Sequence, residues 1–178
     1  FVLHQFLKVI VRKEKMMTLY QIYSAVDNEE AYVDLKQDDR KIVEFINYNK
    51  GNYTDEAVFI AQRGYTSKNI SNTDYIQTIP KMLLFSETFI NKLADNLKNE
   101  LDFFPAKLRI KNDEFKVFLG KIKLTARLVD MEKSNFYEID GERFIDYPPV
   151  FLENISGFEF CAKDINDDLI WAFSDKFK

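Results

Sequence analysis

One seven-residue phrase occurs twice in this chain of 178 residues, and it constrains the fold more than any other feature. It reads LLFSETF at residues 83–89 and WAFSDKF at residues 171–177. In both copies an apolar run, typical of a buried strand, ends at a Ser that is followed by an acidic residue. Ser often precedes the first turn of a helix because its hydroxyl accepts a bond from an unpaired backbone N–H, and an acid there suits the helix dipole. The phrase therefore predicts two strand-to-helix junctions, capped by Ser86 and Ser174.

The predicted helices differ in length, and the Phe before each Ser belongs to the core. After the first junction the apolar residues keep helical spacing to about Leu101, and Pro105 prevents a longer helix. The second helix is predicted to be truncated at residue 178, where the sequence stops. Phe85 and Phe173 follow apolar neighbours in the two strands, so we expect both to be buried.

Length and composition favour one folded domain spanning residues 1–178. Apolar residues make up 46% of the chain, with 17 Phe and 9 Tyr, which is enough to bury a core. Residues 1–16 begin without Met and are expected to be a leader or an N-terminal extension, and their apolar run is too short to span a membrane. The single Cys, Cys161, lies in the apolar segment FEFCA and is expected to be buried and unpaired, which fits a reducing cytoplasm.

The pattern of strand and helix signals predicts an α+β fold, with an antiparallel sheet and a few packed helices. Asp140-Gly141 lies between two apolar runs and predicts a tight hairpin. A second hairpin, with a longer polar loop, is predicted within residues 157–174. The remaining predictions are strands at 18–26, 56–64 and 103–110, a helix or a strand at 39–49, a polar loop at 66–74, and a long strand, or a pair broken near Gly120, at 115–130.

Side chains that perform catalysis or bind metals are scarce, which favours a binding function over an enzyme. With one His, His4, and one Cys the chain cannot build a Ser-His-Asp or Cys-His arrangement or a zinc site of the usual ligands. Five scattered Gly form no phosphate-binding loop. We therefore expect no enzymatic activity, no cofactor and no metal. Asp130 and Glu132 would share one face of a strand, so a carboxylate-dependent enzyme remains the alternative.

The charge is divided unevenly along the chain. The net charge of −4 argues against nucleic acid as a partner. Residues 130–168 hold eleven acidic and three basic residues, whereas residues 104–127 hold seven basic and two acidic ones. Aromatic and basic residues mix in FKVFLGKIKL at 115–124, but an amphipathic strand explains this segment better than an RNA-binding one. This charge asymmetry is a hint about the charge of a partner, or simply an uneven solvated surface, and it says little about the fold.

Three landmarks, in order, give the chain a family resemblance. They are the first Ser-capped junction with its Phe-Pro strand entry at residues 75–110, the D-x-E-K-S sequence at residues 130–134, and the hairpin leading into the second junction at residues 158–178. Over this part, somewhat more than half of the chain, the sequence resembles a family of bacterial immunity proteins from polymorphic-toxin and contact-dependent growth inhibition systems. It departs from the family at Cys161, where such proteins often have a basic residue. The resemblance implies a small cytoplasmic protein that binds and neutralises a cognate toxin without catalytic residues.

Many toxins of these systems are nucleases with basic clefts, so the resemblance and the charge pattern together favour the acidic segment as the binding surface. The D-G hairpin should project from the sheet, and alternation should place its acids near one side. An acidic toxin that meets the basic strands at 104–127 is the competing arrangement, and a structural or adaptor domain of a mobile element is a further alternative function. The candidate partner-binding residues are Asp130, Glu132, Glu138, Asp140 and Glu142.

Overall fold

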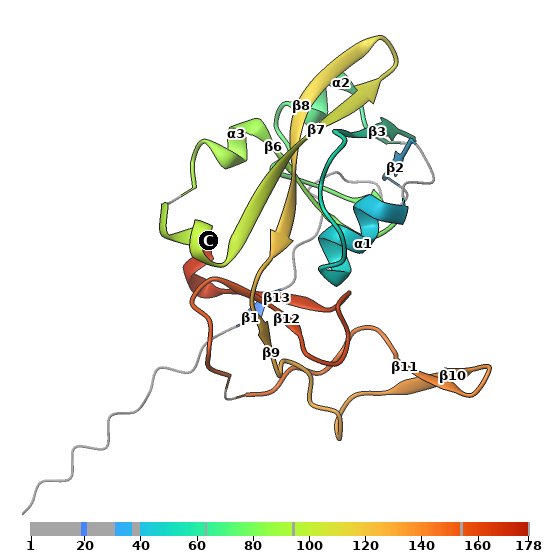
Figure 1. Cartoon of the computed structure of the whole chain (residues 1–178), viewed down its shortest axis with the longest axis vertical. Coiled ribbons are helices and arrows are strands. Elements are labelled where there is room, and N and C mark those ends of the chain that lie inside the picture. Colours follow the sequence, from blue (N-terminus) through green and yellow to red (C-terminus); the bar gives the residue numbers. More distant parts are fainter. Residues whose placement is uncertain are drawn as a thin grey trace, which may run out of the picture.

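A computed structural model describes residues 19–20, 31–36, 40–62, 64–93, 95–153 and 155–177. Its elements fall into an upper and a lower group in Figure 1, with the larger sheet above and a smaller sheet and a separate hairpin below. The helices are α1 (Arg40–Tyr48), α2 (Ser67–Ile70), α3 (Glu87–Ile90) and the 3₁₀-helices η1 (Asp95–Asn99) and η2 (Asp175–Phe177). The strands are β1 (Leu19–Tyr20), β2 (Val33–Leu35), β3 (Ala57–Ala61), β4 (Tyr75–Ile76), β5 (Thr78–Ile79), β6 (Leu83–Ser86), β7 (Leu101–Ile110), β8 (Asp113–Ile122), β9 (Thr125–Ala126), β10 (Phe136–Ile139), β11 (Glu142–Ile145), β12 (Cys161–Asp164) and β13 (Trp171–Ser174).

The larger sheet is built around the long hairpin of β7 and β8. Its strand order within the described residues is β4-β6-β8-β7-β3-β2-β5. Most neighbours are antiparallel, whereas β3 pairs with β7, and β2 with β5, in parallel. Leu108 and Leu119 of the long strands point into the core, where Ile42 and Ile46 of α1 also lie. Because residues four apart share one face of a helix, the helical form buries both Ile side chains together, which decides between helix and strand for this segment.

The lower sheet has the order β1-β13-β12-β9 within the described part of the chain. β12 and β13 form the predicted hairpin with a longer loop, and β9 pairs with β12 in parallel. The structure thus confirms an α+β fold with few helices and sheets rich in antiparallel pairs. Of the strand predicted at residues 18–26, only Leu19 and Tyr20 are described, and they form β1. The predictions for residues 1–16 and for residue 178 lie outside the described residues.

The two copies of the repeated phrase meet in one hydrophobic core where the upper and lower groups join. Phe85 and Phe173 are buried, as predicted. Each packs against the Phe that ends its own phrase, with ring centroids 4.8 Å apart for Phe85 and Phe89 and 4.4 Å apart for Phe173 and Phe177. Phe89 and Phe177 lie 5.9 Å from each other. The repeat therefore joins the two groups through one aromatic cluster.

Both Ser residues cap the turn that follows their strand. The Ser86 hydroxyl accepts a hydrogen bond from the backbone N–H of Phe89 at 3.2 Å, at the start of α3. The Ser174 hydroxyl accepts one from the N–H of Lys176 at 3.2 Å and donates one to the carbonyl of Glu159 at 2.5 Å. The two predicted Ser-capped junctions are confirmed, although the second leads into the short 3₁₀-helix η2.

The helix after the first junction is much shorter than predicted. α3 ends at Ile90, and after η1 the strand β7 begins at Leu101. Helical spacing was misleading because Leu97 and Leu101 are buried from two separate elements and not from one helix face. Pro105 lies inside β7 and does not end a helix. It is tolerated there because β3 pairs with β7 only from Ala106 onward, so the missing N–H breaks no bond of that pairing.

The structure corrects one further local prediction and decides between the two alternatives at Gly120. The polar segment 66–74 contains α2, whose start is stabilised by a capping box: the N–H of Thr66 donates to the Asn69 side chain at 2.7 Å, and the N–H of Asn69 donates to the Thr66 hydroxyl. β8 runs unbroken through Gly120. A Cβ on Gly120 would lie 2.8 Å from the ring of Phe85, so this glycine makes room for the core aromatic and does not end the strand.

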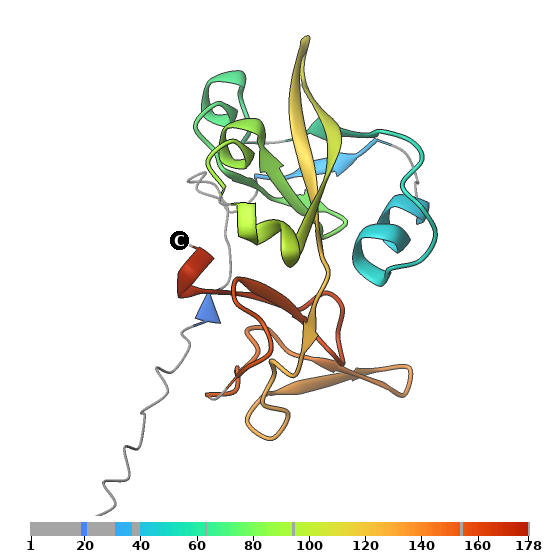
Figure 2. The same ribbon diagram turned by 60° about the vertical axis from the view of Figure 1, so that its left-hand side comes forward.

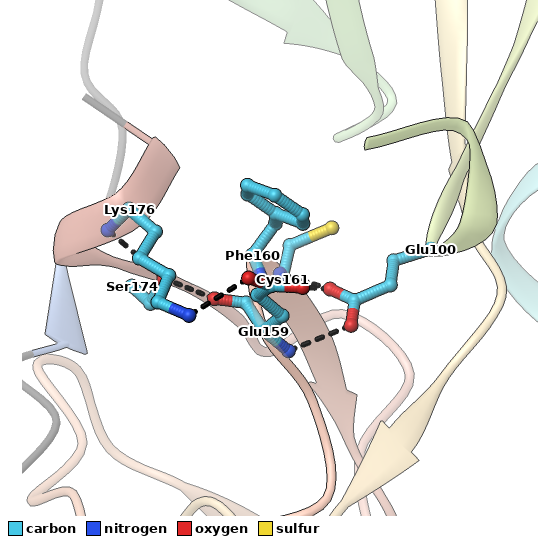
Figure 3. A network of polar contacts seen from close by, with 6 residues as sticks. All are labelled: Glu100, Glu159, Phe160, Cys161, Ser174 and Lys176. Carbon is cyan, nitrogen blue, oxygen red and sulfur yellow. Dashed lines mark hydrogen bonds and ion pairs between the residues drawn. The ribbon is translucent and has the colours of Figure 1, made fainter. Parts of the chain in front are cut away.

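A buried carboxylate fastens the larger sheet to the lower one (Figure 3). Glu100, just before β7, accepts hydrogen bonds from the backbone N–H groups of Glu159 at 2.6 Å, Phe160 at 2.6 Å and Cys161 at 3.0 Å. Only 7% of Glu100 is exposed. Cys161 is fully buried, as predicted, and burial, together with the Glu100 charge, raises the pKa of its thiol far above the ordinary value. This Cys is therefore a core residue.

Candidate partner-binding site

The hairpin of β10 and β11 projects from the lower group of elements, and Figures 1 and 2 agree on this from two directions. It pairs with no other strand among the described residues. Its turn is Asp140-Gly141, where φ is 52° and 84°. Positive φ at both central residues is the requirement of a type I′ turn, which Asp-Gly satisfies and which matches the twist of the strands. The predicted hairpin is thus confirmed, including its turn.

The register of the hairpin sorts its side chains onto two faces. Glu138 lies opposite Arg143, and Ile139 lies opposite Glu142. Because side chains alternate along a strand, the anchored face consists of Phe136, Glu138, Arg143 and Ile145, and the open face consists of Tyr137, Ile139, Glu142 and Phe144.

The anchored face holds the hairpin to the rest of the lower group. Ile145 is buried in the third hydrophobic cluster, and Phe136 packs against the same cluster. The guanidinium carbon of Arg143 lies 3.7 Å from the centroid of the Phe136 ring, a cation–π contact. Asp146 donates its N–H to the carbonyl of Asn135 at 2.9 Å, which continues the pairing past the base of the hairpin. These contacts fix the orientation in which the hairpin projects.

The open face exposes large apolar side chains to solvent. Tyr137 is 47% exposed, Ile139 54% and Phe144 39%. The rings of Tyr137 and Phe144 stack across the strands with centroids 5.6 Å apart and planes 21° apart. We did not predict these residues as part of the site. The sequence holds a signal for them: in FYEIDGERFI both alternating sets of positions contain apolar residues, whereas a hairpin with one covered face needs only one such set.

The predicted arrangement of the hairpin acids is wrong in one respect. Glu138 and Glu142 lie on opposite faces and not on one side, because the two-residue turn pairs Glu138 with Arg143. Asp140 lies at the tip, between the two faces. All three side chains are exposed. None of them forms an ion pair with another described residue. The acids therefore lie on both faces of the hairpin and at its tip.

Asp130 and Glu132 do not share a strand face, because this segment is a turn. The side chain of Asp130 accepts hydrogen bonds from the N–H of Glu132 at 3.1 Å and of Lys133 at 3.2 Å. The ammonium of Lys133 lies 3.4 Å from the same carboxylate. Burial raises the pKa of Asp130, but the N–H groups and the Lys133 charge outweigh this and leave the pKa below its ordinary value. Asp130 is thus engaged by its own turn, which precedes the base of the hairpin.

Other acids of the segment 130–168 are also used internally. The buried carboxylate of Asp164 accepts the N–H groups of Leu128 at 2.8 Å and Val129 at 3.0 Å. Asp168 lies 2.8 Å from the buried ammonium of Lys163. The acidic segment therefore divides into a structural part and an exposed part, and the hairpin tip belongs to the exposed part.

Four of the seven basic side chains of residues 104–127 form ion pairs with nearby acids. Each ion pair joins a basic side chain of residues 104–127 to an exposed carboxylate. The pairs are Lys107 with Glu56 and Glu114 at 3.3 Å, Arg109 with Glu114 at 3.1 Å, Lys116 with Glu87 at 2.8 Å, and Lys123 with Asp102 at 3.1 Å. The positive charge seen in the sequence of this segment is therefore weaker on the folded surface than its composition indicates.

Within the described ranges, no group of three or more His, Cys, Asp or Glu side chains is placed to hold a metal ion. In that same part of the chain, no helix has both the length and the apolar character needed to cross a membrane.

Comparison with known proteins gives no relative: no family model, no curated protein and no solved structure matches the chain.

Proposed function

We propose that this chain is an immunity protein that binds a cognate bacterial toxin in the cytoplasm and neutralises it by protein–protein contact, without a catalytic step. The observation that supports this most is the projecting hairpin, which combines exposed aromatic residues with three acids that have no ion-pair partner among the described residues. The resemblance of residues 75–178 to bacterial immunity proteins supports the same function.

The toxin we propose is a nuclease-type effector with a basic cleft. An acidic hairpin would enter or cover such a cleft in place of the nucleic acid, because both present negative charge to it. A specific complex of ordinary size buries about 1,600 Å² in total, so the hairpin would be the centre of the contact and the neighbouring elements its rim. Long-range attraction would mainly raise the association rate, and it would weaken with salt because the Debye length falls to about 8 Å at physiological ionic strength.

The charge arrangement favours the hairpin over the basic strands as the contact surface. Lys107, Arg109 and Lys116 of β7 and β8 already have acidic neighbours within 3.3 Å, so an acidic toxin would compete with existing pairs. Within the part of the chain that the structure describes, the hairpin acids have no such pairs to break. A basic partner therefore gains more from the hairpin than an acidic partner gains from the strands.

Expression beside the product of the adjacent upstream gene tests the proposal. We expect the two chains to co-purify and this chain to protect cells from that product. Changing Glu138, Asp140 and Glu142 to Lys together should slow association at low salt. A matched variant with Asp55, Asp74 and Asp95 changed to Lys alters the net charge equally and should behave as the wild type. An enzyme or an adaptor domain would show neither co-purification nor protection, and that result would refute the proposal.

A further inference from the structure

The open face of the hairpin is an apolar surface with no covering element among the described residues, which is unusual for a folded chain. Tyr137, Ile139 and Phe144 form it, and each is more than a third exposed. Isolated exposed apolar residues need no explanation. Here, however, Tyr137 lies directly opposite Phe144 in the register and their rings are in contact, so the surface is continuous.

We infer that this face is the anchor of the toxin contact: Tyr137, Ile139 and Phe144 set how long the complex lasts, while the three hairpin acids set how fast it forms. The inference rests on the proposed function and names the part of the surface that dominates its affinity. Aromatic side chains dominate many interfaces because they bury a large area and have few rotamers to lose.

Contacts within the hairpin and on its anchored face hold the open face in one conformation before binding. The contact between Arg143 and Phe136 and the burial of Ile145 hold the opposite side of the same two strands. Stacking of Tyr137 on Phe144 restricts both rings before any partner arrives. The hairpin side chains therefore lose little conformational entropy when a partner buries this face. More of the free energy of apolar burial then contributes to the affinity.

The charges of the hairpin determine which kind of partner can bind the open face. Glu142 shares the open face, Asp140 forms the tip and Glu138 lies on the reverse side. A second copy of this chain would bring these like charges together, and an anionic membrane surface would be repelled in the same way. The occupant that the chemistry favours is a basic protein surface with an apolar centre. Such a surface gains from the aromatic residues and from the acids at once.

Binding kinetics separate the two contributions. Truncation of central apolar contacts acts mainly on dissociation, whereas removal of peripheral charges acts mainly on association. The probe is the toxin domain encoded by the adjacent upstream gene, immobilised for surface plasmon resonance. The main variant changes Tyr137 and Phe144 to Thr, which keeps β-forming residues in both strands. A second variant, Ile139→Thr, removes the large aliphatic side chain from the same face and leaves the net charge and both rings unchanged.

We expect both variants to dissociate at least about 100-fold faster while their association rates stay within about threefold of wild type. The matched control Tyr48→Thr removes an equally exposed aromatic residue, 40% exposed, from the end of α1 and should change neither rate. Unfolding temperatures equal to wild type show that the variants fold. If the wild type binds but both variants keep its dissociation rate, the inference is wrong and the proposed function stands. If the wild type itself does not bind, the proposed function fails and the inference fails with it.

Discussion

Replacing Glu100 by Ala should destabilise the protein more than any surface change, because one carboxylate serves three backbone donors. These donors are the N–H groups of Glu159, Phe160 and Cys161, at 2.6, 2.6 and 3.0 Å. The first lies near solvent and can bond to water instead, whereas the other two are buried. Leaving a buried donor without an acceptor costs about 1–3 kcal/mol, so the two buried groups together account for about 4 kcal/mol.

A change of this size is readily measured. For a chain of this length about 4 kcal/mol corresponds to a fall of about 10 °C in the unfolding temperature. The fluorescence of Trp171, which belongs to the same hydrophobic cluster, reports unfolding in urea. Glu100→Gln should cost about half as much, because its carbonyl oxygen can still accept two of the three N–H groups while its amide faces the third.

Glu153→Ala is the matched control, since this Glu side chain is 75% exposed and its ion pair with Lys133 is long at 3.6 Å. It should leave the free energy of unfolding unchanged. The reasoning is refuted if Glu100→Ala destabilises the chain by no more than the control, or if Glu100→Gln costs more than Glu100→Ala.

The remaining predictions concern the repeated phrase and the core. Ser86→Ala and Ser174→Ala should each lower the free energy of unfolding by about 1 kcal/mol, measured in urea, and a neutral effect of either would contradict its capping function. Gly120→Ala should destabilise the protein because its Cβ would lie 2.8 Å from the Phe85 ring, and an unchanged unfolding temperature would contradict this. The Cys161 thiol should resist a disulfide reagent at pH 8 until the chain unfolds, because burial raises its pKa. The unfolded thiol ionises near pH 9.0 and the folded one does not, so this residue should lower stability as the pH rises above that value.

Local chemistry was enough to predict the junctions and the tight hairpin. Ser86 and Ser174 act within three residues of their own position, and Asp140-Gly141 specifies its own turn. Such caps and turns depend only on residues that are close in sequence, so they can be predicted from a single sequence.

Features that depend on distant partners could not be predicted. The Glu100 carboxylate accepts hydrogen bonds from N–H groups that are 59 to 61 residues away in sequence, and no local sequence pattern predicts that contact. The prediction of a helix that reaches Leu101 was wrong for the same reason. Leu97 and Leu101 are buried in one cluster, but they reach it from two separate elements and not from one face of a helix. The faces of the hairpin required its register, which the turn type sets: a two-residue turn places Glu138 opposite Arg143 and leaves Tyr137 with Phe144.

Hydrogen exchange of the complex tests the location of the binding surface most directly. This chain would be compared alone and bound to the toxin domain encoded upstream, with exchange followed at each backbone N–H. The account predicts that binding slows exchange most at β10 and β11, from Phe136 to Ile145, and leaves the basic strands β7 and β8 unchanged. Slower exchange confined to residues 104–127, with the hairpin unaffected, would contradict it.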